Sequence, residues 1–162
     1  MKLLVICLGN ICRSPMGEGA LRARIAEAGL AGRVQVDSAG TSGWHAGDPP
    51  DRRAVACAKR HGVDISTLRA RQLITEDFLH FDHIFCADRE NLTEALKLAP
   101  AEASDRAVLW LPWAGISDSA VVPDPYYGGD ADFERSWTLV DAAARATVQR
   151  LFQRDDSGII PT

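Results

Sequence analysis

The chain has 162 residues, which suits one compact domain large enough to bury a core. Hydrophobic residues make up 46% of it and charged residues 25%, as in an ordinary globular protein. The formal net charge of -4 argues against nucleic-acid binding, because neutralising phosphates requires an excess of positive charge. We therefore expect no nucleic-acid partner.

The N-terminus imitates a signal peptide, with Lys2 before an apolar run. Gly9 and Asn10 end that run too early for a signal core, and no stretch reaches the length of a membrane span. We expect a cytoplasmic protein without membrane insertion. The four cysteines should then be free thiols, and their spacing lacks the paired C-x-x-C units of a structural zinc site, so no metal is expected.

Strand and helix signals alternate along the chain. Buried strands are predicted at residues 2–8, 34–37, 82–88 and 106–111. Helices are predicted from residue 15 to about 29, and at 51–62, 89–99 and 131–152, with Ser14 as the first N-cap and Pro15 as the first helical residue. Residues 40–50 and the segment from 112 are loops, and the tail from 155 to 162 is expected to be frayed. The alternation predicts a parallel sheet flanked by helices, with ligands beyond the carboxyl ends of its strands.

The sequence "VICLGNICRSP" crosses from the first strand into the first helix, at that carboxyl edge. A short loop entering a helix directs several backbone N–H groups inward, and Gly9 permits the required backbone geometry. Arg13 adds a planar fork of donors that matches two phosphate oxygens. A tetrahedral oxyanion is the natural guest. Cys7 lies at the floor of this positive cradle, which favours the thiolate, and a thiolate beneath a bound phosphate is a nucleophile.

Phosphate ester hydrolysis also needs a proton donor for the leaving oxygen. Asp124 lies between two prolines in "VVPDPYYGGDAD", which restrict the backbone and can hold the carboxyl group over the loop. An Asp-Pro pair is also a common turn, and only its combination with the thiol–arginine loop favours a catalytic acid.

The two motifs "CLGNICRSP" and "DPYYGGDADFE" resemble those of the low-molecular-weight protein tyrosine phosphatases, and similar segments follow the family order over residues 1–152. The resemblance implies a single domain over residues 1–154, an α/β fold of three layers with a four-stranded parallel sheet, flavodoxin-like. It also implies hydrolysis of phosphotyrosine in two steps through a phosphocysteine, with no metal or other cofactor.

Carried over by position, the resemblance makes Cys7 the nucleophile, Arg13 the phosphate ligand and Asp124 the general acid and base. The substrate would contact the loop residues and three aromatic walls, namely Leu8, Gly9, Asn10, Ile11, Cys12, Ser14, Trp44, Tyr126 and Tyr127. Asn10, Ser14 and Ser38 would shape the loop, and Ser14 could assist the departing thiolate. Asp88 is a further supporting candidate, although a helix N-cap explains it as well.

Several of these residues have an ordinary alternative. Trp44 can be a loop anchor, and Tyr126 and Tyr127 can be phosphorylation sites instead of walls. Cys12 can be a loop filler or a thiol that traps oxidised Cys7 as a disulfide.

The chain also departs from the family pattern. Many members carry a His two residues before "ARQ", thought to brace the loop asparagine, and here that position is Leu68. We expect Ser38 to carry more of this bracing.

Two rival functions remain open at this stage. Arsenate is also a tetrahedral oxyanion, so an arsenate reductase could use the same loop, although Cys57 and Cys86 do not form the close pair of a disulfide relay. A phosphotyrosine-binding or redox-sensing module would not need Cys7, Arg13 and Asp124 together. The partners we expect are phosphotyrosine proteins, a bacterial tyrosine kinase among the candidates, and we expect a monomer.

Overall fold

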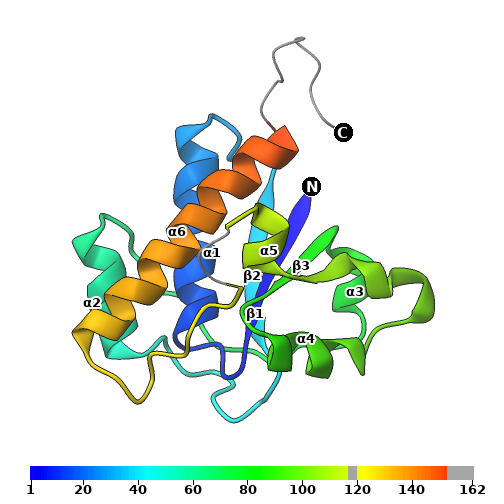
Figure 1. The fold of residues 1–162 in the computed structure, drawn as a ribbon, viewed down its shortest axis with the longest axis horizontal. Helices are drawn as coiled ribbons and strands as arrows, with labels where there is room; N and C mark the ends of the chain where they lie inside the picture. Colours follow the sequence, from blue (N-terminus) through cyan, green and yellow to red (C-terminus); the bar gives the residue numbers. More distant parts are fainter. Residues whose placement is uncertain (117–119, 153–162) are drawn as a thin grey trace.

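The sheet at the centre of the molecule is parallel and four-stranded, as predicted. The computed structural model describes residues 1–116 and 120–152, so the predicted tail at 155–162 lies outside the described residues. The strands follow the order β2-β1-β3-β4 (Figure 1). Their bounds are Lys2–Cys7 for β1, Gln35–Gly40 for β2, His83–Cys86 for β3 and Ala107–Leu109 for β4. This order is that of a flavodoxin-like sheet.

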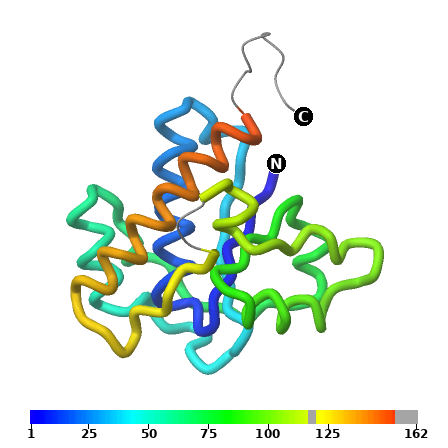
Figure 2. Tube along the Cα trace, viewed as in Figure 1, coloured from blue at the N-terminus to red at the C-terminus, as the bar shows by residue number. Residues whose placement is uncertain are grey.

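Helices cover both faces of the sheet. The helices α1 (Arg13–Glu27), α2 (Arg52–Arg60) and α6 (Asp130–Phe152) lie on one side, and α3 (Asp77–His80) and α4 (Arg89–Leu96) lie on the other (Figure 1). The trace in Figure 2 shows α6 crossing α1 along much of its length, and these two helices pack against each other. Among the described residues, no helix combines the length and the apolar character needed to cross a bilayer.

The central strand β1 divides the core into two clusters. Leu3 and Val5 belong to the cluster under α1 and α6, whereas Leu4 and Ile6 belong to the cluster on the other face. All four are buried, because a central strand of a parallel sheet has a helical layer on each side. Burying a side chain of this size stabilises the fold by about 1.5–3 kcal/mol.

The predicted start of the first helix is wrong. Helix α1 begins at Arg13, and Cys12 is its N-cap residue without a side-chain capping bond. Ser14 lies inside the first turn of α1. Its hydroxyl group contacts Cys7 and Asn10 and does not cap the helix.

Short helices account for the other differences. The fourth strand ends at Leu109, and α5 (Trp110–Ala114) replaces its predicted end and the start of the predicted loop. Helix α3 and the 3₁₀ helix η1 (Ala101–Arg106) were not predicted either. Elements of four to six residues are too short to display a helical period, so tertiary contacts decide them. In α5, for example, the buried Trp110 donates a hydrogen bond to Thr147 Oγ1 of α6 at 3.0 Å.

The carboxyl ends of the strands gather three loops at one edge of the molecule, at the bottom of Figure 1. Cys7 is the last residue of β1 and pairs with Gly40, the last residue of β2. A Cβ atom on Gly40 would approach the Leu8 carbonyl oxygen to 2.7 Å, so glycine is required for this close approach. The edge therefore brings the loops after β1 and β2 into direct contact.

Candidate active site

The loop from Cys7 to Ser14, which we call the anion loop (residues 7–14), is a turn between β1 and α1 that is buried except at Leu8, Gly9 and Ile11. Cys7 and Arg13 are each only 3% exposed. Asn10 adopts a left-handed backbone conformation with φ of 57°, which asparagine tolerates better than most residues. The turn thereby passes directly from the strand end into the helix start, where backbone N–H groups lack helical partners.

The Cys7 thiol has one close polar neighbour in its own loop. Its Sγ lies 3.0 Å from Ser14 Oγ. Because Ser14 Oγ already accepts a hydrogen bond from Asn10 Nδ2 at 2.7 Å, its hydroxyl proton can point toward the sulfur. The arrangement suits a sulfur that carries negative charge.

Cys12 lies in the same loop and is buried as well. Burial raises the pKa of the Cys12 thiol well above its usual range, and the charges of Asp51, Cys7 and Asp124 raise it further, against a smaller opposing effect of Arg53. Cys12 is therefore held as a neutral thiol beside Cys7.

Arg13 is fixed at one end of its guanidinium group. Its Nη1 donates to Asp88 Oδ2 at 2.6 Å and to the Val122 carbonyl oxygen at 3.0 Å, while Nη2 lies 3.7 Å from Asp124 Oδ2. Burial lowers the pKa of Arg13, but the charges of Cys7, Asp88 and Asp124 outweigh it, so the pKa is raised overall. The guanidinium group is thus a permanent, oriented positive charge next to the thiol.

Asp124 belongs to a second segment, residues 122–129, which we call the acid segment. In contrast with the anion loop, its carboxyl side chain is 42% exposed. Asp124 Oδ1 accepts a hydrogen bond from the Tyr126 N–H at 3.1 Å. The two loops meet at Arg13, which brings a thiol, a cation and a carboxylate together from positions up to 117 residues apart in sequence, the separation of Cys7 and Asp124 (124 − 7).

A cavity of about 250 Å³ opens between these groups. It is lined by Cys7, Leu8, Gly9, Ile11, Cys12, Arg13, Trp44, His45, Asp124, Tyr126 and Tyr127. All three predicted catalytic residues and all three predicted aromatic walls therefore face one space. His45 was not predicted, although it directly follows Trp44 in the sequence.

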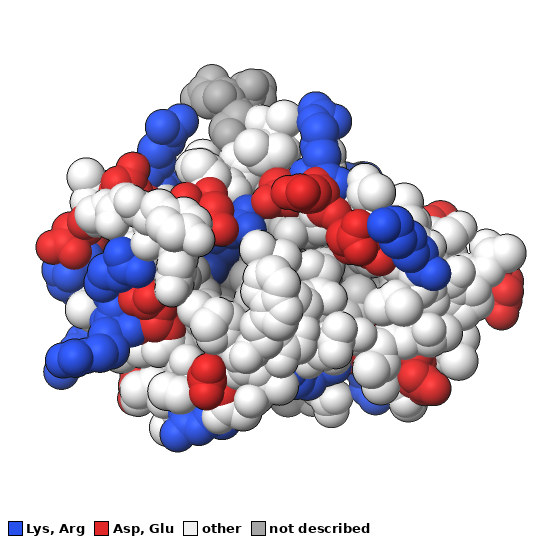
Figure 3. Space-filling view, turned by 90° about the horizontal axis from the view of Figure 1, so that it is seen from below, with Lys and Arg blue, Asp and Glu red and all other residues white. Residues whose placement is uncertain are grey.

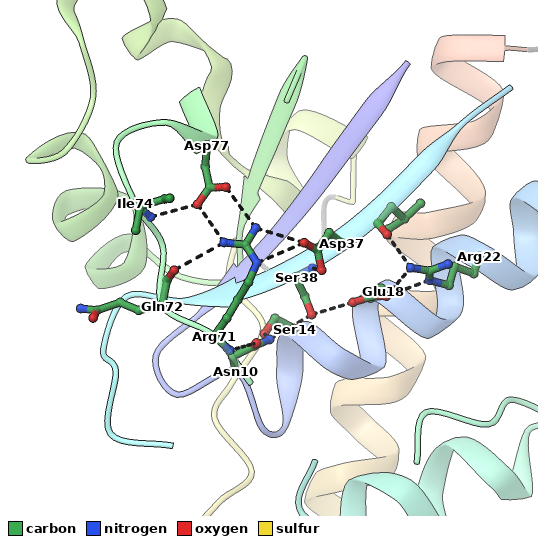
Figure 4. A network of polar contacts seen from close by, with 11 residues as sticks. Asn10, Ser14, Glu18, Arg22, Asp37, Ser38, Arg71, Gln72, Ile74 and Asp77 are labelled. Atoms are coloured by element: carbon green, nitrogen blue, oxygen red, sulfur yellow. Dashed lines mark hydrogen bonds and ion pairs between the residues drawn. The ribbon is translucent and has the colours of Figure 1, made fainter. Parts of the chain in front are cut away.

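Three predicted residues do not line the cavity, namely Asn10 and Ser14 of the anion loop and Ser38 of β2. The Asn10 Nδ2 group donates to Ser14 Oγ and, at 2.9 Å, to Ser38 Oγ (Figure 4). Ser38 in turn donates to Glu18 Oε1 at 2.8 Å. The side chains of Asn10, Ser14 and Ser38 thus hold the loop, as predicted, while the further prediction that Asn10 and Ser14 contact substrate has no counterpart in the cavity lining.

Main chain from the segment after Leu68 also binds the Asn10 side chain. The backbone N–H of Arg71 donates to Asn10 Oδ1 at 3.0 Å, and the Arg71 guanidinium group pairs with Asp37 and Asp77 at 3.0–3.1 Å (Figure 4). Asn10 is therefore bound through both ends of its amide. Ser38 accepts a hydrogen bond from the amide nitrogen, as expected, and the Arg71 N–H donates to the amide oxygen.

Glu18 anchors the far end of this chain of contacts. Its residue is 2% exposed, and Arg22 compensates its charge with Nε at 2.8 Å from Oε2. Burial raises the pKa of Glu18, although hydrogen bonding from Ser38 and the charge of Arg22 oppose the shift. A buried carboxylate needs such partners to remain ionised.

Asp88 fulfils both of the roles considered for it. Its Oδ1 accepts the Asn91 N–H at 2.8 Å in a capping box at the start of α4, and its Oδ2 binds Arg13. One carboxylate therefore joins the start of α4 to the cation of the site.

The mouth of the cavity is apolar and exposed. Trp44 is 82% exposed and Tyr127 is 96% exposed, whereas Tyr126 is 40% exposed. Viewed from below, this face of the molecule has uncharged side chains at its centre and charged side chains of both signs toward the side of α2 (Figure 3). Exposed aromatic side chains of this kind mark a contact surface for a flat apolar group.

Among the described residues, one further group could provide metal ligands, namely Cys57, His61 and Glu134. It lies between α2 and α6 and does not line the cavity. Glu134 is already compensated by His61 at 2.7 Å and Arg60 at 2.8 Å. Burial raises the pKa of Cys57 to about 11, which opposes the thiolate that a metal would need.

Comparison with known proteins agrees with this geometry. The model of the family described as "Low molecular weight phosphotyrosine protein phosphatase" matches residues 2–156. A low molecular weight protein-tyrosine-phosphatase of Synechocystis is similar, with 44% identity over 144 residues, covering 88% of this chain and 91% of the relative. The human low molecular weight phosphotyrosine protein phosphatase is 38% identical over 151 residues, which cover 91% of this chain and 94% of the human protein.

Solved structures show the same relationship. The crystal structure of a protein tyrosine phosphatase from Entamoeba histolytica, with Hepes in the active site, superposes with a TM-score of 0.90 at 34% identity. The match covers 93% of this chain and 96% of that chain. With the family matched over nearly its whole length, and with the thiol, arginine and carboxylate around one cavity, the chain belongs to the low molecular weight protein-tyrosine-phosphatase family.

Proposed function

We propose that this phosphatase hydrolyses phosphotyrosine and other aryl phosphate monoesters in two steps, through a phosphocysteine on Cys7. The observation that carries the proposal is the convergence of Cys7, Arg13 and Asp124 on one cavity of about 250 Å³. A site that only bound phosphotyrosine would need the cation and the aromatic walls but not a nucleophile and an acid.

In the first step, the Cys7 thiolate attacks phosphorus and the bond to the aryl oxygen breaks. Arg13 and the N–H groups of the anion loop stabilise the negative charge on the phosphoryl oxygens in the transition state. Asp124 donates its proton to the leaving aryl oxygen. Its exposed position at the cavity mouth suits contact with an atom farther out than the phosphoryl group.

In the second step, water attacks the phosphocysteine and the sulfur–phosphorus bond breaks. Asp124, now ionised, accepts a proton from that water, which returns the acid to its starting state. The Ser14 hydroxyl group, 3.0 Å from Cys7 Sγ, stabilises the thiolate that leaves. The cycle uses no group other than side chains, backbone N–H groups and water.

The depth of the cavity favours phosphotyrosine over phosphoserine. The nucleophile is 3% exposed, and Trp44, Tyr126 and Tyr127 stand around the mouth. A flat ring between aromatic walls can carry its phosphate down to the sulfur, whereas the short serine side chain cannot. We expect protein substrates, with a bacterial tyrosine kinase among the candidates, and a monomer acting in the cytoplasm.

Hydrolysis of p-nitrophenyl phosphate tests the mechanism. The wild type is compared with Cys7→Ser and Asp124→Asn in EDTA, in the steady state and in a single turnover. We expect no turnover for Cys7→Ser and a loss of about 10²- to 10⁴-fold for Asp124→Asn, the usual contribution of general acid–base catalysis. Wild-type protein that binds phosphate but does not turn over would contradict the proposal.

Cys12 gives the same site a protective reaction. We propose that peroxide oxidises Cys7 to a sulfenic acid, which condenses with the Cys12 thiol to a disulfide and releases water. Both sulfurs belong to cavity-lining residues, and both cysteines are free in the reduced protein. After peroxide treatment, the wild type should regain its activity with dithiothreitol, whereas Cys12→Ser should regain much less. Equal recovery of the two proteins would exclude the protective role.

The arsenate reductase alternative finds little support in the remaining cysteines. A disulfide relay needs further thiols within reach of the nucleophile. Cys57 lies on α2 and Cys86 ends β3, and neither lines the cavity that Cys7 and Cys12 share. We therefore favour hydrolysis over reduction.

A further inference from the structure

The first turn of α2 contacts both loops of the site, although it contributes no group to the proposed chemistry. Asp51, the N-cap residue of α2, donates its backbone N–H to the Ile11 carbonyl oxygen of the anion loop at 2.8 Å. Arg53, two residues later, reaches the acid segment. One helix start thus contacts the anion loop through the backbone of Asp51 and the acid segment through the side chain of Arg53.

The two side chains form a closed ion pair. Arg53 donates Nε to Asp51 Oδ1 at 3.1 Å and Nη2 to Asp51 Oδ2 at 3.0 Å, and its backbone N–H also binds Oδ1 at 2.8 Å. This side-on geometry orients the planar guanidinium group and costs less conformational freedom for each bond than separate contacts would. The pair therefore gives the guanidinium group a defined direction.

That direction is toward the acid segment. Arg53 Nη2 donates to the Tyr126 carbonyl oxygen at 2.9 Å, and Nη1 donates to the Gly128 carbonyl oxygen at 3.2 Å. The same guanidinium carbon lies 4.7 Å from the ring centre of Phe133 and 5.6 Å from that of Tyr126. Charge-assisted hydrogen bonds and ring contacts from Arg53 together hold the acid segment in place.

The contact reaches Asp124 through a single residue. Tyr126 accepts from Arg53 with its carbonyl group and donates from its own N–H to Asp124 Oδ1 at 3.1 Å. Asp124 is itself 42% exposed, so its carboxylate depends on a few contacts, namely the Tyr126 N–H and Arg13 Nη2 at 3.7 Å. The acid segment carries two glycines, Gly128 and Gly129, which make it deformable without such a tie.

We propose that Arg53, oriented by Asp51, is a positioning residue that sets the place of the general acid Asp124 relative to the anion loop. The proposal rests on the proposed function, because it assigns Arg53 a role only through the acid. Displacing a catalytic group by about 1 Å can cost up to 10²-fold in rate, so loss of this contact should be measurable.

The test compares kcat/KM for two substrates, phenyl phosphate and p-nitrophenyl phosphate, in Arg53→Met and Arg53→Lys. Phenolate is a poorer leaving group than p-nitrophenolate, so hydrolysis of phenyl phosphate depends more on protonation by the general acid. We expect Arg53→Met to lose about 10- to 100-fold on phenyl phosphate and clearly less on p-nitrophenyl phosphate. Arg53→Lys keeps the positive charge but loses the planar fork of donors, so its kcat/KM should lie between those of the wild type and Arg53→Met. Arg52→Met, on the exposed side of the same turn, is the matched control and should remain within about twofold of the wild type.

A double-mutant cycle with Asp124→Asn separates positioning from general structural damage. In the Asp124→Asn background, Arg53→Met should add less than about twofold on either substrate, because the group that it positions is gone. Equal losses on both substrates, or fully additive losses in the double variant, would overturn the proposal. Wild-type inactivity, or an Asp124→Asn variant as fast as wild type, would instead overturn the proposed function.

Discussion

The anion loop and the acid segment supply complementary groups to one cavity, yet they are stabilised in different ways. In the anion loop, Asn10, Arg13 and Ser14 are at most 3% exposed, and their polar groups are bound by side chains and main chain from three parts of the chain. In the acid segment, Asp124 is exposed, and the contacts from outside reach mainly backbone carbonyl groups.

Under the proposed function, the difference follows from what each loop has to do. The anion loop must present fixed donors to a phosphate group, and a buried network lowers the reorganisation needed at the moment of reaction. The acid must meet a leaving oxygen and later a water molecule, so it has to stay accessible at the mouth. A segment held through its backbone keeps its place while leaving its side chain free to exchange partners.

Among the variants that test this contrast between the loops, replacement of Arg13, which contacts both, should have the largest effect. Arg13→Lys keeps the positive charge but loses the fork that binds Asp88 and Val122 on one side and faces Asp124 on the other. We expect kcat/KM for p-nitrophenyl phosphate to fall by about 10²- to 10³-fold, the usual effect of losing one oriented donor to transition-state charge. Arg89→Lys, exposed at the start of α4, is the control and should be unchanged. Activity of Arg13→Lys near that of the wild type would show that charge alone suffices.

Replacing Asn10 tests the buried network of the anion loop by itself. Asn10→Gly retains the left-handed backbone but removes the bonds to Ser14, Ser38 and the Arg71 N–H. We expect a loss of about 1–3 kcal/mol in the free energy of unfolding, because buried polar groups lose their partner. Asn10→Ala should cost about 1 kcal/mol more, since it also strains the left-handed backbone. Urea unfolding gives the free energy of unfolding of both variants, and kcat/KM is measured for the same two proteins.

If the glycine variant were as stable as the wild type, the network would not contribute to stability. If it were less stable but equally active, the network would serve the fold and not the geometry of the site. Either result would weaken the contrast between the two loops.

A smaller effect is expected where α2 joins the two loops. Asp51→Asn can still cap α2, whereas Asp51→Ala loses the cap and should cost about 1 kcal/mol. Hydrogen bonding from Arg53 holds the pKa of Asp51 below its usual value, against the opposing effect of burial. The ionised pair therefore stabilises the fold above the ordinary carboxyl pKa, and this contribution is lost as the pH falls through the lowered value.

The stability difference between the wild type and Asp51→Asn should accordingly be largest near pH 7 and shrink in acid. It should also be small, because Arg53 is partly exposed to solvent and water screens the pair. Urea unfolding at several pH values measures it. A difference that grows toward acidic pH would contradict the assigned sign.

The sequence alone predicted the groups that the structure brings to one cavity, because their spacing within each motif is local. Cys7 and Arg13 occupy one strand-to-helix turn, and Asp124 is bounded by two prolines. The parallel sheet also followed from the sequence, since alternating apolar strands and amphipathic helices have few other ways to bury their surfaces. The long helix α6 displays several turns of its period and was predicted to within one residue at its start.

Only the tertiary structure decided how those groups are held, because each tie joins residues far apart in sequence. Arg71 binds Asn10 across 61 positions, and Arg53 binds Tyr126 across 73. A hydrogen bond to a backbone carbonyl group or N–H requires no particular residue type at the accepting or donating position, so it leaves no pattern to read. The short helices α3 and α5 were hidden for a related reason, since packing fixes them and their length shows no period.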